Sequence, residues 1–193
     1  MKTLLEQVGI EDFLVRLSEK HPDSVYVMKF LSDFIVKSEC QRIEFGKFKI
    51  SAHGASLVDR VIINEDVLTH PLSYVLYVIF HEIAHQYQYK KYGIDKMYDL
   101  YLGKIPINEG AIWLKQIEEV ADDFAFRKLR QLVKSTDKIK LDISKLKKNY
   151  DNIPLEKYKK LVEFTISLIK NENYTDKNEI SEILYNNIVK VKK

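Results

Sequence analysis

The sequence contains a single cysteine among its 193 residues, so it cannot form an intrachain disulfide. No apolar stretch approaches the length of a membrane span. The first twenty residues carry Glu6, Glu11 and Asp12 and lack the apolar core of a signal peptide. No internal repeat or low-complexity linker is recognisable. We therefore expect a cytoplasmic globular protein, with Cys40 as a half-buried structural thiol.

A strong charge of either sign is also lacking. The formal net charge is +3 at pH 7, with 46% hydrophobic and 31% charged residues, which is typical of a globular protein. Lysines outnumber acidic residues from Lys134 onward. We interpret this basic part as a solvated helical surface, and we expect neither a membrane nor a nucleic acid as a partner. Nothing in the sequence indicates an oligomeric state.

Apolar periodicity predicts a mostly helical α+β protein with a small antiparallel or mixed sheet. Residues 1–135 are expected to form the main domain, with N-terminal helices, and residues 136–193 a helical C-terminal extension packed on it. Strands are predicted at 42–50 and 58–64 and are expected to pair antiparallel, with a turn at Gly54. The segment 93–107 is interpreted as a connector. The predicted helices, with approximate bounds, are 3–19, 23–38, 72–92, 108–132, 154–169 and 176–190.

The most informative stretch of the sequence is His81-Glu82-Ile83-Ala84-His85, an H-E-x-x-H motif inside the predicted central helix. Residues four apart share one face of a helix, so both imidazoles can point at one ion. Glu82 lies next to the position that the ion leaves open for water. Two neutral nitrogen ligands and a carboxylate base are the parts that a zinc peptidase requires.

A catalytic zinc needs a third protein ligand, and no histidine follows His85. The three other histidines precede the motif in turn contexts, so a carboxylate is the better candidate. Glu118 and Asp122 are four residues apart on the next long helix, and Ala121 between them permits a close approach to the motif helix. Glu118 can reach the metal while Asp122 orients a ligand histidine. Glu119 is the alternative ligand, but its side chain is expected to point away.

Together, H-E-x-x-H and the later Glu118-x-x-Ala121-Asp122 resemble the gluzincin metallopeptidases. The continuation Asp123-Phe124-Ala125 is similar to the ImmA/IrrE-like intracellular branch of that group. The resemblance implies a zincin-like fold, a Zn²⁺ cofactor and an intracellular protein substrate. It implies His81, His85 and Glu118 as zinc ligands, Glu82 as general base, and Asp122 as the residue that orients a ligand. A strand that precedes the motif is also similar to SprT-like proteases, which typically use a third histidine instead.

The expected reaction is hydrolysis of a peptide bond, with Glu82 taking a proton from a zinc-bound water. A further donor is expected at the carbonyl oxygen, and the strand at 59–64 is expected to offer an edge for an extended substrate. The candidate donors are tyrosines, namely Tyr87, Tyr89, Tyr92, Tyr98 and Tyr101. The alternative function is a catalytically silent zinc-binding structural or regulatory protein. A nucleic-acid-binding protein is a third class, recognisable by a steep salt dependence.

Overall fold

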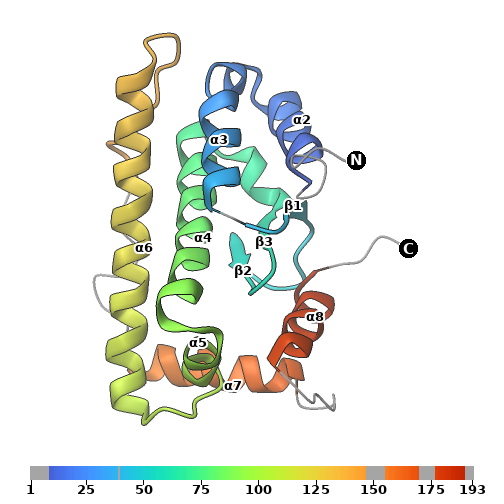
Figure 1. Cartoon of the computed structure of the whole chain (residues 1–193), viewed down its shortest axis with the longest axis vertical. Helices are drawn as coiled ribbons and strands as arrows, with labels where there is room; N and C mark the ends of the chain where they lie inside the picture. Colours follow the sequence, from blue (N-terminus) through green and yellow to red (C-terminus); the bar gives the residue numbers. More distant parts are fainter. Residues whose placement is uncertain (1–8, 39, 147–154, 170–176, 190–193) are drawn as a thin grey trace.

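The computed structural model of the chain describes residues 9–38, 40–146, 155–169 and 177–189, and in these the protein is mostly helical (Figure 1). A helix is present in each predicted range, with different ends; residues 3–8 of the first predicted helix lie outside the described residues. The α-helices are α2 (Ile10–Lys20), α3 (Met28–Ser38), α4 (Leu72–Tyr92), α5 (Ile94–Tyr101), α6 (Ile107–Ser135), α7 (Leu155–Ile169) and α8 (Lys177–Ile188). Two 3-10 helices, η1 (Pro22–Tyr26) and η2 (Glu65–Thr69), precede α3 and α4.

Three short strands form one mixed sheet in the order β1-β3-β2. They are β1 (Ile43–Gly46), β2 (Gly54–Ser56) and β3 (Val61–Asn64). The predicted antiparallel pairing of the two apolar strands is wrong, because β1 and β3 run parallel. A tight turn, closed by hydrogen bonds between Leu57 and Arg60, makes β2 the antiparallel neighbour of β3 instead. Because β3 is the central strand, the prediction that residues 59–64 offer a sheet edge is wrong. Strand β2 lies at an edge of the sheet instead.

The sheet is covered on both sides, which explains the uninterrupted apolar run in β3. Side chains alternate along a strand, so Val61 and Ile63 face one way and Ile62 faces the other. Val61 and Ile63 belong to the main core, which α2, α3, α4 and α6 complete. Ile62 belongs to a second core shared with α5 and α8. Helix α4 lies between the long helix α6 and the sheet (Figure 1), and it is buried along most of its length.

Three predictions about local structure need correction. Cys40 is buried, with 3% of its surface exposed, and not half-buried. The segment 93–107 is not simply a connector, because it contains α5. Gly93 and Gly103 both adopt positive φ at the two ends of this helix and allow the chain to turn there. The helix predicted at 23–38 is divided, with a 3-10 turn at Pro22–Tyr26 before α3 begins at Met28.

The C-terminal helices pack on the rest of the chain. Tyr158 of α7 is fully buried and donates a hydrogen bond to the carbonyl oxygen of Leu100 at 2.6 Å. After α8 the chain pairs with the segment that follows β1, through a bridge between Phe48 and Val189. The predicted domain boundary at residue 135 stays a prediction. Helices α7 and α8 share two hydrophobic cores with the preceding elements. Among the described residues, no helix combines the length and apolar character needed to cross a membrane.

Candidate metal centre

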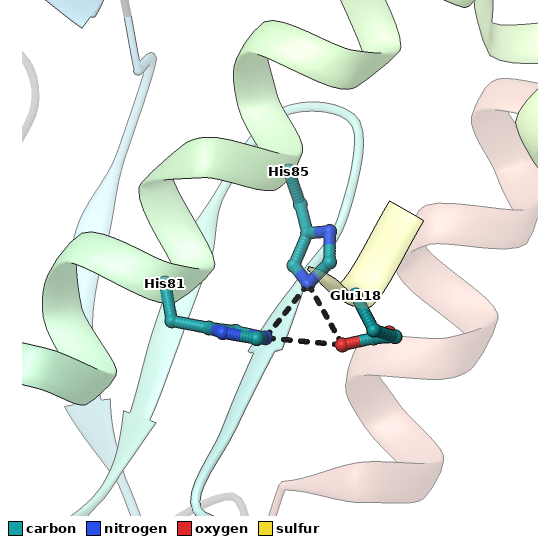
Figure 2. A group of neighbouring side chains, drawn as sticks. All are labelled: His81, His85 and Glu118. Carbon is teal, nitrogen blue, oxygen red and sulfur yellow. Dashed lines mark hydrogen bonds and ion pairs between the residues drawn. The ribbon is translucent and has the colours of Figure 1, made fainter. Parts of the chain in front are cut away.

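Helix α4 carries the motif. Pro71 precedes its first turn, and Gly93, with positive φ, ends it, so the helix has the bounds that these two residues predict. His81, Glu82 and His85 are all buried. The imidazoles of His81 and His85 project from successive turns toward the same point (Figure 2).

Helix α6 supplies the carboxylates. Ala121 and Ala125 are completely buried, and these small side chains allow α6 to approach α4 closely. Glu118 points toward the two imidazoles (Figure 2), and Asp122 lies one turn further along α6. Glu119 instead forms an ion pair with Lys115 at 3.5 Å. Among the described residues, His81, His85 and Glu118 form the one group of metal-ligating side chains whose ligand atoms converge.

The distances among these atoms fit a tetrahedral ion. His81 Nε2 lies 3.2 Å from His85 Nε2 and 3.1 Å from Glu118 Oε2. His85 Nε2 lies 3.8 Å from the same carboxylate oxygen. Zinc bound at 2.0–2.1 Å by tetrahedral ligands keeps neighbouring ligand atoms about 3.3 Å apart. The three atoms therefore occupy three corners of a zinc-sized tetrahedron.

Hydrogen bonds to the other ring nitrogens determine the tautomers. His81 Nδ1 lies 2.9 Å from Asp122 Oδ1, and His85 Nδ1 lies 2.7 Å from Gln88 Oε1. An ionised carboxylate can only accept, so His81 Nδ1 carries a proton. The amide nitrogen of Gln88 donates to the carbonyl oxygen of Ile117 at 2.7 Å, which turns its oxygen toward His85. Both Nε2 atoms are therefore left with lone pairs that can bind a metal.

This arrangement brings two imidazole lone pairs and a carboxylate oxygen together in a buried space. Such a group of acceptors requires a positive charge among them, either a proton or a cation. Burial alone would lower the pKa of His81, but its hydrogen bonds to Asp122 and Glu118 raise it to about 10. Burial raises the pKa of Glu118, and the two histidines outweigh this effect and lower it. A metal ion would therefore compete with a proton held at His81.

Glu82 lies in the same cleft, against the edge strand. Burial raises its pKa, although His85 and His81 oppose the shift. A Cβ atom built on Gly54 of β2 would lie 2.5 Å from Glu82 Cγ, so only a glycine leaves room for this side chain. The sequence analysis interpreted Gly54 only as a turn residue. A glycine within a strand is a signal of close approach, but this segment was not predicted as a strand, so the sequence did not indicate the contact.

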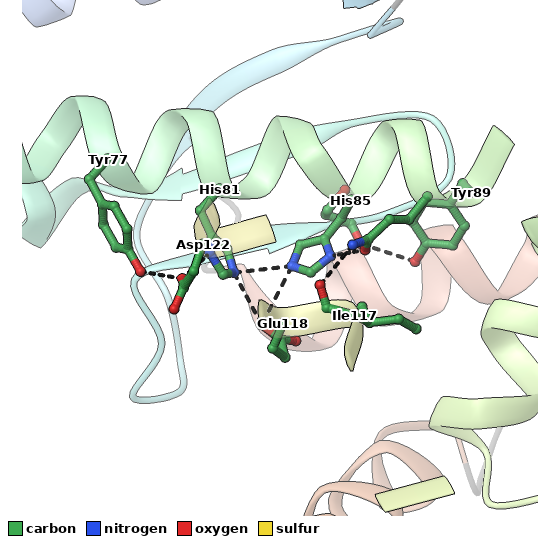
Figure 3. A network of polar contacts seen from close by, with 9 residues as sticks. Tyr77, His81, His85, Tyr89, Ile117, Glu118 and Asp122 are labelled. Atoms are coloured by element: carbon green, nitrogen blue, oxygen red, sulfur yellow. Dashed lines mark hydrogen bonds and ion pairs between the residues drawn. The ribbon is translucent and has the colours of Figure 1, made fainter. Parts of the chain in front are cut away.

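Sequence reasoning also missed two supporting side chains. Tyr77 donates a hydrogen bond to Asp122 (Figure 3), and Gln88 holds His85. Tyr77 lies four residues before His81, and Gln88 lies three residues after His85. Both positions lie on the helix face of the motif histidines, so helical spacing made them candidates, although it could not identify the contact of Tyr77 with Asp122 on α6.

The site opens into a cleft of about 550 Å³. His81, Glu82, His85 and Glu118 line it, together with β2 and residues of α5, α7 and α8. Of the five tyrosines predicted as candidate donors, only Tyr89, Tyr98 and Tyr101 reach this cleft. The hydroxyl of Tyr89 donates to the carbonyl oxygen of Ser56 at 3.1 Å, and that of Tyr98 is hydrogen-bonded to Ser181 at 2.8 Å. Tyr74 and Tyr77 also line the cleft, although the sequence analysis did not consider them.

No family model matches the chain, and no curated protein or solved structure matches it. The interpretation of this centre therefore depends on the geometry of the residues themselves.

Proposed function

We propose that the chain is a zinc-dependent metallopeptidase of zincin-like fold that hydrolyses peptide bonds in a cytoplasmic protein substrate. One observation carries this proposal: His81, His85 and Glu118 direct three metal-binding atoms at one point, 3.1–3.8 Å apart, in a cleft that also contains Glu82. The converging atoms require a positive charge, which a metal ion can supply in place of a proton, and Glu82 is the only additional carboxylate among the described residues that line the cleft.

Each residue has a defined task in this proposal. His81, His85 and Glu118 would hold the ion, which would supply a Lewis acid for the carbonyl oxygen and for water. Glu82 would accept a proton from the attacking water and return it to the leaving amine. Burial favours the protonated form of Glu82, which makes its carboxylate a stronger base than an exposed one. Asp122 and Gln88 would hold the two rings so that both Nε2 atoms point toward the ion.

A second function is supported by the origin of the ligands. Two come from α4 and one from α6, so a bound ion would also fasten the two central helices to each other. A zinc-binding structural or regulatory protein would need this fastening but would not need Glu82 as a base.

The test compares the wild-type protein with Glu82→Gln, Glu118→Gln and the control Glu119→Gln, whose carboxylate pairs with Lys115 instead. We expect about one zinc per chain and cleavage of unfolded casein by the wild-type protein and by Glu119→Gln. Glu118→Gln should bind zinc more weakly. Glu82→Gln should keep its zinc and lose activity by a factor of at least about 100. Full activity in Glu82→Gln would exclude the mechanism, and zinc without Glu82-dependent cleavage would favour the structural function.

A further inference from the structure

The C-terminal helices form one wall of the cleft. Seven described residues of α7 and α8 line it, and five of these are apolar: Leu161, Phe164, Leu168, Leu184 and Ile188. The sixth, Thr165, uses its hydroxyl within the helix by donating to the carbonyl oxygen of Leu161 at 2.8 Å. Lys157, at the start of α7, is the one ionisable side chain of this wall among the described residues. The metal ligands therefore face a wall of low polarity.

This wall is fixed to the rest of the protein. The buried hydroxyl of Tyr98 is hydrogen-bonded to Ser181 at 2.8 Å, which ties α5 to α8. The guanidinium of Arg60 is ion-paired with Glu182 and lies 4.5 Å from the ring centre of Tyr185. A fixed wall can select among ligands by shape and polarity, because it does not rearrange to suit each of them.

Phe164 is the clearest indication that the wall receives something. Its side chain lines the cleft, remains 38% exposed and belongs to none of the three hydrophobic cores. Its contribution to folding is therefore small. Ile166 on the same helix is equally exposed, at 39%, but does not line the cleft. A single exposed apolar residue is ordinary, but a large one in a concave apolar wall indicates a ligand surface.

Another part of the cleft suits an extended peptide. Residues 54–56 of β2 line it, and in the described structure only β3 pairs with this strand. Its other edge, where the carbonyl oxygen of Ser56 already accepts from Tyr89, can add an extended segment through its remaining main-chain groups. Side chains of such a segment alternate in direction, so some would point toward the wall formed by α7 and α8.

We infer that α7 and α8 form a specificity wall that selects peptide substrates with a bulky apolar side chain, aromatic or branched aliphatic, near the cleaved bond. This inference rests on the proposed peptidase function. The ligand of the wall is taken to be a peptide because the wall and the candidate metal site line the same cleft. The five apolar residues of the wall would disfavour charged side chains beside them, since these would lose water there without gaining a polar partner.

The first experiment measures cleavage of a peptide mixture that presents every residue type on both sides of each bond. Products of the zinc-loaded wild-type protein, Phe164→Ala, Phe164→Leu and the control Ile166→Ala are identified by mass spectrometry. We expect the wild-type protein and Ile166→Ala to prefer Phe, Leu or Ile at one position. In Phe164→Ala the ratio of cleavage at these apolar residues to cleavage at other residues should fall about tenfold, whereas Phe164→Leu should keep most of it. Cleavage that depends on Glu82 but shows no apolar preference would overturn the inference and leave the function intact.

A second experiment separates the inference from catalysis. Binding of pentapeptide amides that differ only in a central Phe, Ala or Asp is measured by NMR titration of the metal-free Glu82→Gln protein, with and without Phe164→Ala. Tighter binding of the Phe peptide, weakened by Phe164→Ala, would support the wall even if the wild-type protein cleaved nothing. Equal binding of the three peptides would overturn it.

Discussion

Replacing Gly54 with alanine should inactivate the site without removing its metal. The new Cβ would lie 2.5 Å from Glu82 Cγ, whereas ordinary contact begins at 3.4 Å, so Glu82 must move by roughly 1 Å. The backbone of Gly54 does not have the positive φ that disfavours alanine, so the conflict is with the side chain alone. The candidate metal ligands His81, His85 and Glu118 lie on α4 and α6, and the three atoms nearest to the added Cβ all belong to Glu82.

A displacement of this size in a catalytic group costs about 100-fold in rate, which corresponds to about 2.7 kcal/mol in the activation free energy. The assay is kcat for a peptide that the wild-type protein cleaves, together with the zinc content of each protein. Gly46→Ala is the matched control, because it adds a Cβ to another strand and meets Val189 and Ile62, away from the cleft. Unchanged kcat in Gly54→Ala, or a loss of zinc in parallel with activity, would refute the reasoning.

Three further predictions concern the surroundings of the site and the stability of the fold. Asp122→Ala should weaken zinc binding about 10- to 100-fold in chelator competition, since His81 loses its partner, while the exposed Asp123→Ala should not. Burial raises the pKa of Cys40 from 9.0 to about 11, so the unfolded chain ionises first and the unfolding free energy should fall by about 2 kcal/mol between pH 9 and 11, relative to Cys40→Ala in urea titrations; a constant difference would contradict this. Gly110→Ala should destabilise the protein by about 1–3 kcal/mol in thermal unfolding, because its Cβ would lie 2.3 Å from the hydroxyl oxygen of Tyr158. When Tyr158→Ala is already present, adding Gly110→Ala should cause little further loss of stability.

The helices were predictable because their signals are local. Pro71 and Gly93 mark the ends of α4, and the four-residue spacings of His81 with His85 and of Glu118 with Asp122 follow from helical periodicity. The convergence of these side chains was anticipated from Ala121, which allows the two helices to approach. The structure brings the four side chains together, and their roles in binding and catalysis stay predictions.

The sheet was less predictable because its pairing is not local. The Gly54-Ala55-Ser56 segment has no apolar alternation, so nothing distinguished β2 from a turn. Without β2, the strand at 61–64 was assigned the wrong partner and the wrong position in the sheet. The identity of the supporting residues Tyr77 and Gln88 also depends on where α6 lies relative to α4, which one helix's periodicity cannot give.

The dependence of the sheet on α8 has a consequence for synthesis of the protein. All candidate metal ligands have been translated once Glu118 is added, but the second core lacks Ile180, Leu184 and Ile188 until much later. A nascent chain that ends before α8 therefore exposes Phe48 and Ile62 to water. Because domains fold as units during translation, such a chain cannot complete its cleft. If the chain is the zinc peptidase proposed above, zinc acquisition and cleavage would accordingly be delayed until α8 is available to complete the cleft, and no active site would form in a partly made chain.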